Sequence, residues 1–265
     1  MRGFLPGDAQ QGSGAAGATV PNEEIEALFD REFHCPVCDT VFKNKIIRSG
    51  KNRLNGQDID LRGHFEPVDA EKYNVLMCPE CGHAAMSRYF NVSPGKKAEA
   101  IREWMKPEPE PEDPSFYTYE MAINRIRAAM KDAMIRSAKT SETGYIALHS
   151  AWLLRGYREQ MEKDATDEHP VDETKCKRLK DAEEMYIAMA TERLTQAVTA
   201  ESFPICGMEE QTFQYLLAAL HYKTGKYAEA MRFLLPVLQD RKIQPNLRIM
   251  AEDLRDECRK KQRAK

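Results

Sequence analysis

The chain has 265 residues, of which 42% are hydrophobic and 31% are charged. This length suits two domains of ordinary size, and the apolar content is enough to build a core, which excludes a wholly disordered protein. The 39 Lys and Arg residues and 42 Asp and Glu residues give a net charge of −3. This balance excludes a global positive field that would draw the whole chain to nucleic acid or to an acidic membrane.

The N-terminal stretch predicts neither a secretory signal nor a membrane span. Residues 1–20 are rich in Gly and Ala and lack the apolar region of a signal peptide, so we expect a disordered tail. Nowhere do apolar residues run on for about 18 positions, the length that a membrane helix needs. Four of the seven cysteines stand in two CxxC pairs, which is typical of metal binding in a reducing compartment. We therefore expect a cytoplasmic protein.

The two cysteine pairs are the strongest chemical signal in the chain. Both have the form CPxC, and 78 − 38 − 1 = 39 residues separate them. Each pair offers two thiolates to one edge of a tetrahedron, which suits Zn²⁺. Gly82 and Asp39 follow the pairs, at positions where such turns tend to need a positive φ. The sequence predicts a closed, structural Zn²⁺ site, with a dithiol redox centre or an iron site as alternatives; the ligands would be Cys35, Cys38, Cys78 and Cys81.

Residues 21–106 are expected to form a zinc-binding module with flanking helices. A short helix is predicted over 20–31, and a second one begins at Ser93 and Pro94. Between them, β-forming residues alternate with turn signals, which favours a zinc-ribbon-like β module. His34 and His83 lie close to the cysteines, where we expect second-shell hydrogen bonds rather than metal ligation, and His64 has no partner at metal-ligand spacing.

The insert between the cysteine pairs carries a local positive charge. Between residues 40 and 57 there are five cations and no acid, and the cations are Lys43, Lys45, Arg48, Lys51 and Arg53. They could neutralise the tetrathiolate site, or they could contact phosphate or nucleic acid. Asp58 and Asp60 follow at an i, i+2 spacing, so on a strand both carboxylates would face one side. We expect them to form cross-strand ion pairs with the basic strand.

Residues 107–114 separate this module from a helical region. The stretch PEPEPEDP has nothing to bury, which predicts an extended acidic linker and a domain boundary. Residues 115–265 are expected to form six helices joined by short connections, over 117–139, 142–163, 174–201, 208–224, 227–240 and 246–263. The predicted fold class is therefore α+β, with a small β module followed by an all-α domain.

Residues 212–238 carry the most informative helical pattern. Small Ala218 and Ala230 permit two helices to approach closely, and Gly225 forms the turn between them. This hairpin resembles a tetratricopeptide repeat, whose G-x-Y-x-x-A turn matches Gly225, Tyr227 and Ala230, although Gln214 replaces the usual aromatic residue. By analogy with such repeats, a protein or peptide partner is expected on the helical face.

Several phrases together resemble one bacterial family. These are the two CPxC pairs with the insert between them, SETGYIALHSAWLLRGY, and ESFPICGMEEQTFQYLLAALHYKTGKYAEAMRFLLPVL. Over roughly 33–247 the layout is similar to that of the bacterial domain of unknown function 2225 family. The resemblance implies a zinc-binding module joined to a helical repeat scaffold, with no reaction to carry over. Asp39 departs from the usual glycine, and the acidic linker and the loop 164–173 are longer than in the family.

These observations leave three functional hypotheses. The first is a cytoplasmic, non-enzymatic adaptor with a structural zinc site and a protein-binding helical domain. The second is a nucleic-acid-binding protein that uses the basic insert, and the third is a thiol redox sensor. The chain carries no P-loop, GxGxxG, HExxH or Ser-His-Asp signature, so an enzymatic role has little support. The two-domain division also predicts that loss of Cys78 would unfold the N-terminal module and leave the helices intact.

Overall fold

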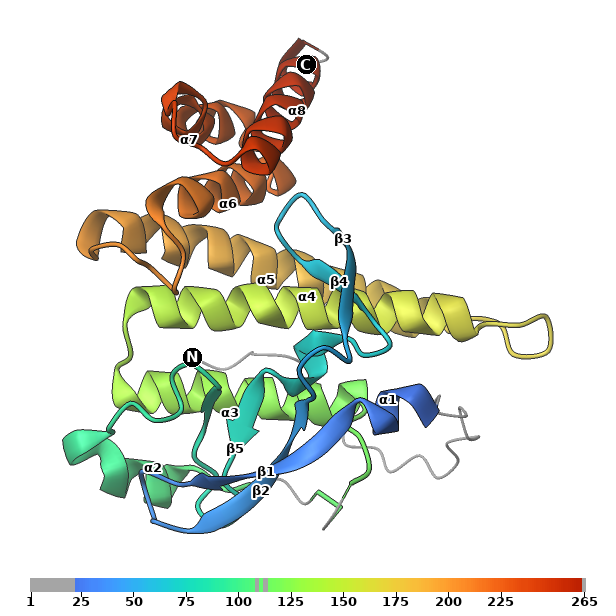
Figure 1. Ribbon diagram of the computed structural model, residues 1–265, viewed down its shortest axis with the longest axis vertical. Coiled ribbons are helices and arrows are strands. Elements are labelled where there is room, and N and C mark those ends of the chain that lie inside the picture. The colour runs from blue at the N-terminus through green and yellow to red at the C-terminus, as the bar shows by residue number, and fades with distance from the viewer. Residues whose placement is uncertain (1–21, 108–109, 112–113, 264–265) are drawn as a thin grey trace.

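The computed structural model describes residues 22–107, 110–111 and 114–263 (Figure 1). The predicted tail over 1–20 lies outside the described residues. A short helix, α1 (Asn22–Glu26), opens the described part and leads directly into strand β1 (Leu28–His34). The helix predicted over 20–31 is therefore wrong in its second half. The backbone groups of that half bond to a neighbouring strand, since Leu28 pairs with Ile47 and His34 with Val41.

The β module consists of three antiparallel hairpins rather than one sheet. β1 pairs with β2 (Val41–Ile47), β3 (Arg53–Gln57) with β4 (Gly63–Glu66), and β5 (Val75–Met77) with β6 (Ala84–Met86). A 3₁₀ turn, η1 (Ala70–Tyr73), joins the second hairpin to the third. A second turn, η2 (Gly95–Lys97), leads into helix α2 (Ala98–Trp104), near the helix predicted from Ser93. The middle hairpin projects from the module toward the helical end of the molecule (Figure 1).

Six helices make up the second half, close to the predicted ranges. They are α3 (Tyr119–Arg136), α4 (Thr140–Asp164), α5 (Glu173–Ala200), α6 (Glu210–Lys223), α7 (Tyr227–Gln239) and α8 (Pro245–Arg263). Thr118 caps α3 by accepting a hydrogen bond from the Met121 amide, and Asp172 caps α5 in the same way from Lys175. Gly225 has φ +73° in the turn between α6 and α7, as the hairpin pattern predicts.

The β module and the helices share a hydrophobic core. Val75 and Met77 of β5 and the Ala84–Met86 strand β6 pack against α3 and α4, where Ile126, Ile146 and Leu153 are buried. Figure 1 shows β5 lying directly against α3. The acidic linker also contacts the core, because Glu110 accepts hydrogen bonds from the buried Arg125 of α3. The two halves therefore lie against each other, whatever their independence as folding units.

The described helices were also compared with the requirements of a bilayer. Among them, none combines the length and the apolar content that crossing a membrane would demand.

Candidate metal centre

The two CPxC turns have the same backbone geometry. In the first, the Cys35 amide donates to the Thr40 carbonyl and the Asp39 amide donates to the Cys35 carbonyl. In the second, Cys78 donates to His83 and Gly82 donates to Cys78 in the same positions. Both turns end in the left-handed region, with φ +60° at Asp39 and +73° at Gly82, as the sequence predicts. Local turn chemistry thus presents two matching pairs of thiols.

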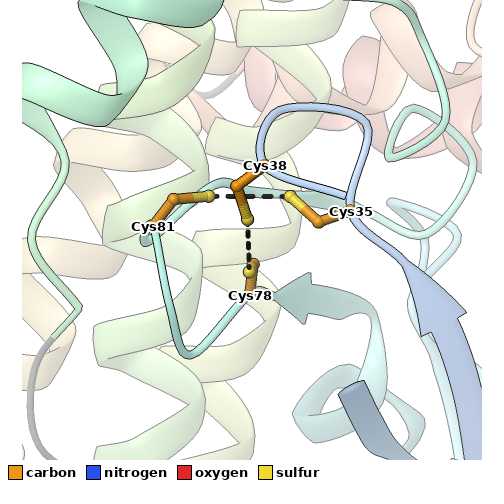
Figure 2. Close-up of side chains that lie close together, drawn as sticks. All are labelled: Cys35, Cys38, Cys78 and Cys81. Atoms are coloured by element: carbon orange, nitrogen blue, oxygen red, sulfur yellow. Dashed lines mark hydrogen bonds between the residues drawn. The ribbon is translucent and has the colours of Figure 1, made fainter. Parts of the chain in front are cut away.

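The turns bring all four sulfur atoms to one point (Figure 2). The Sγ atoms of Cys35 and Cys81 lie 3.6 Å apart, as do those of Cys38 and Cys78, and all four lie within 4.8 Å of one another. A tetrahedral ion with metal–sulfur bonds of about 2.3 Å requires sulfur separations of about 3.8 Å. The four cysteines could therefore hold a metal ion.

The arrangement differs from that of a dithiol redox pair. Each short contact joins one cysteine of the first turn to one of the second, whereas a redox CxxC would pair within its own motif. The separations also exceed a disulfide bond of about 2.05 Å, and all seven cysteines are free. Among the thiols, hydrogen bonds from Cys35 and Cys81 lower the pKa of Cys78, which favours its thiolate form. Its hydrogen bond with Cys78 raises the pKa of Cys35.

Helix α2 and the segment after it cover the cysteine cluster. Arg102 donates two hydrogen bonds, at 2.9 and 2.6 Å, to the Val37 carbonyl inside the first turn. Ile101 and Met105 pack against the cysteines in one buried cluster. At Gly82 a Cβ atom would meet the Pro107 nitrogen at 3.0 Å and the Met105 Cβ at 3.2 Å. Glycine at this position therefore meets two demands, the positive φ and the close approach of the covering segment.

The histidines of the module have partners other than the sulfur atoms. The ring of His83 is buried, with Nδ1 2.7 Å from Asp132 Oδ2 and Nε2 3.3 Å from the Phe90 carbonyl oxygen. His64 Nε2 lies 2.7 Å from Asp58 Oδ1, and His34 is exposed. None of these rings belongs to the cysteine cluster.

The five cations of the insert lie among acidic residues. Lys45 pairs with Asp30 at 2.8 Å, Lys43 lies opposite Glu32 in the β1–β2 register, and Arg53 lies opposite Glu66 in the β3–β4 register. Lys51 and Arg53 line an open hollow of about 600 Å³ together with Glu23, Glu26 and Glu66. Arg48 donates to the Leu28 carbonyl and stacks over Phe29. The structure thus spreads these cations over two hairpins.

The predicted cross-strand pairing of Asp58 and Asp60 with the basic strand is wrong. Both carboxylates do face one side, but they lie in the turn after β3 and bind a helix. Arg155 of α4 contacts Asp60 at 2.7 and 3.1 Å and Asp58 at 2.5 Å, while Lys223 of α6 lies 3.3 Å from Asp60. Arg155 is 95 residues from Asp60, so strand pairing rules gave no indication of this contact.

Sequence analysis also missed the role of Gly156. This residue sits inside α4, where Ala would normally be preferred. A Cβ atom at this position would meet Asp69 Oδ2 at 2.3 Å, Arg62 NH2 at 2.8 Å and the Tyr119 hydroxyl at 3.0 Å. The phrase LLRGY therefore marks the surface of α4 on which the β3–β4 hairpin docks. An Arg-Gly pair within a long helix is the signal that pointed to it.

Comparison with known proteins adds the family. The sequence matches the profile described as "Uncharacterized protein conserved in bacteria (DUF2225)" over residues 28–258. The chain belongs to this family. The DUF2225 match spans the cysteine module and almost all of the helical region, and so agrees with the resemblance drawn from the sequence. The chain has no significant match among curated proteins or solved structures.

Proposed function

We propose that this DUF2225 protein is a non-enzymatic adaptor whose four cysteines bind one structural Zn²⁺. The observation that supports the metal is the convergence of four thiols on one point, with separations close to those around a tetrahedral zinc ion. Four protein ligands close the coordination sphere, so the ion would stabilise the fold rather than activate water or substrate. Zinc bound in this way contributes about 10–16 kcal/mol in small metal-dependent domains.

The zinc-ribbon description fits the local geometry of the module. Two CPxC turns with identical hydrogen bonding lie at the ends of β1–β2 and β5–β6, as in a ribbon with an inserted hairpin. Amide hydrogen bonds to sulfur, such as that from Val37 to Cys35 at 3.4 Å, favour thiolates and thus a bound cation. This donor set suits Zn²⁺ or iron.

The partner-binding role is proposed for the helical half. The α6–α7 hairpin has the tetratricopeptide-like turn at Gly225, and its contact residues Ala218, Ala230 and Leu234 are fully buried. Such hairpins stack into scaffolds that bind peptides or proteins. A nucleic-acid role is less well supported, because the cations of the insert lie among carboxylates rather than in one basic face.

Metal analysis of the purified protein tests the first part of the proposal. We expect one zinc per chain by elemental mass spectrometry. Substituting Co²⁺ should produce the intense sulfur-to-cobalt charge-transfer absorption of tetrahedral thiolate ligation. Cys78→Ser should abolish the stoichiometric metal, whereas Cys176→Ser, which changes a thiol on α5, should retain it. Metal-free protein with a disulfide between Cys35 and Cys38 would instead support the redox hypothesis.

A pull-down from cells of the native host tests the second part. The full chain should retain a specific protein at physiological salt. Recovery of nucleic acid instead, with an affinity that falls steeply as salt rises, would favour the nucleic-acid hypothesis.

A further inference from the structure

The turn between β3 and β4 occupies the groove between the helices. We call residues 58–61 the tip, and it reaches α4, α6 and α8 from the far end of the module (Figure 1). The side chain of Leu61 packs against two buried clusters, one formed by α4, α5 and α6 and one by α6, α7 and α8. A short segment of the module thus lies where a helical scaffold would receive a peptide.

Charge complementarity fixes the tip in this groove. Asp60 is fully buried, and its two carboxylate oxygens accept a fork of hydrogen bonds from Arg155. Lys223 adds a second cation 3.3 Å away. Burial alone would raise the pKa of Asp60, but Arg155 and Lys223 together lower it, so the carboxylate is charged. The groove therefore offers a paired cationic site to one acidic side chain.

The tip contacts the groove through alternate residues. Asp58 and Asp60 face Arg155, Leu61 inserts between the helical clusters, and Ile59 points away and is 42% exposed. This is how an extended peptide binds a groove, with two acidic residues and one apolar anchor recognised and one position left free. The sequence that the groove reads is Asp-x-Asp-Leu.

The hairpin that carries the tip has little support of its own. β3 and β4 form an isolated two-stranded sheet, and most residues of β3 are exposed. A two-stranded hairpin is marginally stable at best without packing partners. The tip can therefore leave the groove without breaking a larger sheet.

We propose that the groove between α4, α6 and α8 is a recognition site for an acidic protein segment of the form Asp-x-Asp-apolar, and that the tip is its resident occupant. The partner segment takes the contacts of Asp60 and Leu61 after it displaces the tip. The tip thus competes in cis and sets a threshold on partner affinity, because a tethered segment has a roughly millimolar effective concentration. This inference rests on the partner-binding role proposed for the helical half.

The test measures binding of a labelled copy of the tip. The probe is the peptide GQDIDLRG, residues 56–63, and the control peptide carries Asn in place of both aspartates. Asp60→Ala removes the carboxylate that anchors the resident tip. By fluorescence polarisation, the probe should bind Asp60→Ala at least about tenfold more tightly than it binds the wild type, because the competing segment is weakened. The control peptide should bind neither protein.

A second substitution assigns the binding to the groove. Adding Lys223→Met to Asp60→Ala should weaken probe binding about tenfold or more, since it removes one of the two cations. The matched change Lys180→Met, at an exposed lysine on α5, should leave probe binding unchanged. Equal effects of the two lysine substitutions would assign the binding to general charge attraction and overturn the proposal.

Two further outcomes would also overturn it. An Asp60→Ala protein that retains zinc and helical circular dichroism but binds the probe no better than the wild type would show that the groove is no receptor, and the zinc proposal would be unaffected. A wild-type dimer that Asp60→Ala dissociates would assign the groove to a second copy of the chain.

Hydrogen exchange on the wild type provides a test that needs no variant. The Leu61 amide donates to the Asp58 carbonyl in the docked turn. Excess probe should accelerate exchange in residues 58–62 while α4 and α6 stay protected. Unchanged exchange at saturating probe would contradict displacement.

Discussion

The Nδ1 atom of His83 lies 2.7 Å from Asp132 Oδ2, and this buried contact joins the second cysteine turn to the middle of α3. The same carboxylate accepts hydrogen bonds from Arg136 and from the Ala84 amide. A carboxylate with three donors is held in one position, so the turn that presents Cys81 is tied directly to the helical core.

This connection changes the prediction for Cys78→Ser. The sequence alone predicts that only the N-terminal module would unfold. Because β5 and β6 share a core with α3 and α4, we now expect loss of metal to lower the unfolding temperature of the helices as well. The free energy of unfolding should fall by more than about 4 kcal/mol. Thermal unfolding followed by circular dichroism at 222 nm measures this, with Cys176→Ser as the control. An unchanged helical transition would restore the picture of two independent domains.

The buried Arg125 should depend on the acidic linker. Its guanidinium donates to Glu110 at 2.8 and 2.5 Å and to Asn44 at 2.7 Å, and it stacks 3.8 Å from the Tyr117 ring centroid. Glu110→Gln would remove the charge that balances this cation, so we expect a loss of about 2 kcal/mol in the free energy of unfolding. Urea denaturation measures the change.

Glu120→Gln is the matched control for the linker substitution. Glu120 forms an exposed ion pair with Lys175 at 3.3 Å, so its loss should cost less than about 0.5 kcal/mol. Equal effects of the two substitutions would mean that Glu110 is not a structural partner of Arg125.

Gly156→Ala should destabilise the protein although it lies in a helix. In an open helix this change gains about 1 kcal/mol. In α4 the new methyl group would collide with the ends of Asp69 and Arg62, whose ion pair holds the β3–β4 hairpin on the helix. We expect a net loss of about 1–3 kcal/mol in urea denaturation, with faster hydrogen exchange in residues 53–66. A stabilised variant would show that the hairpin yields without cost.

His221 should make stability depend on pH. Burial, followed by the nearby Lys226, lowers the pKa of this histidine, whereas in the unfolded chain it is about 6.5. Below pH 6.5 the unfolded state therefore binds more protons than the folded state, and stability falls as the pH falls. His221→Gln should flatten the dependence of the urea midpoint on pH between about 7.5 and 5. The exposed His169→Gln is the control, and a slope equally reduced by both changes would contradict the assignment.

The sequence by itself determined the local features of this protein. The two CPxC turns were identifiable because ligand spacing and positive φ preferences act over a few residues, as Asp39 and Gly82 confirm. The helices from α3 to α8 were identifiable for the same reason, since apolar periodicity and caps such as Thr118 are local signals. The family was also accessible, because its phrases combine these local signals in one order.

Only the tertiary structure decided where the charged residues of the insert go. Asp60 finds Arg155 across 95 residues, and His83 finds Asp132 across 49. Any surface cation could satisfy an aspartate by sequence rules alone, so the predicted strand pairing of Asp60 was reasonable in type and wrong in partner. The physical reason is that ion pairs depend on distance and burial, which the packing of the hairpin on α4 sets and no local pattern encodes.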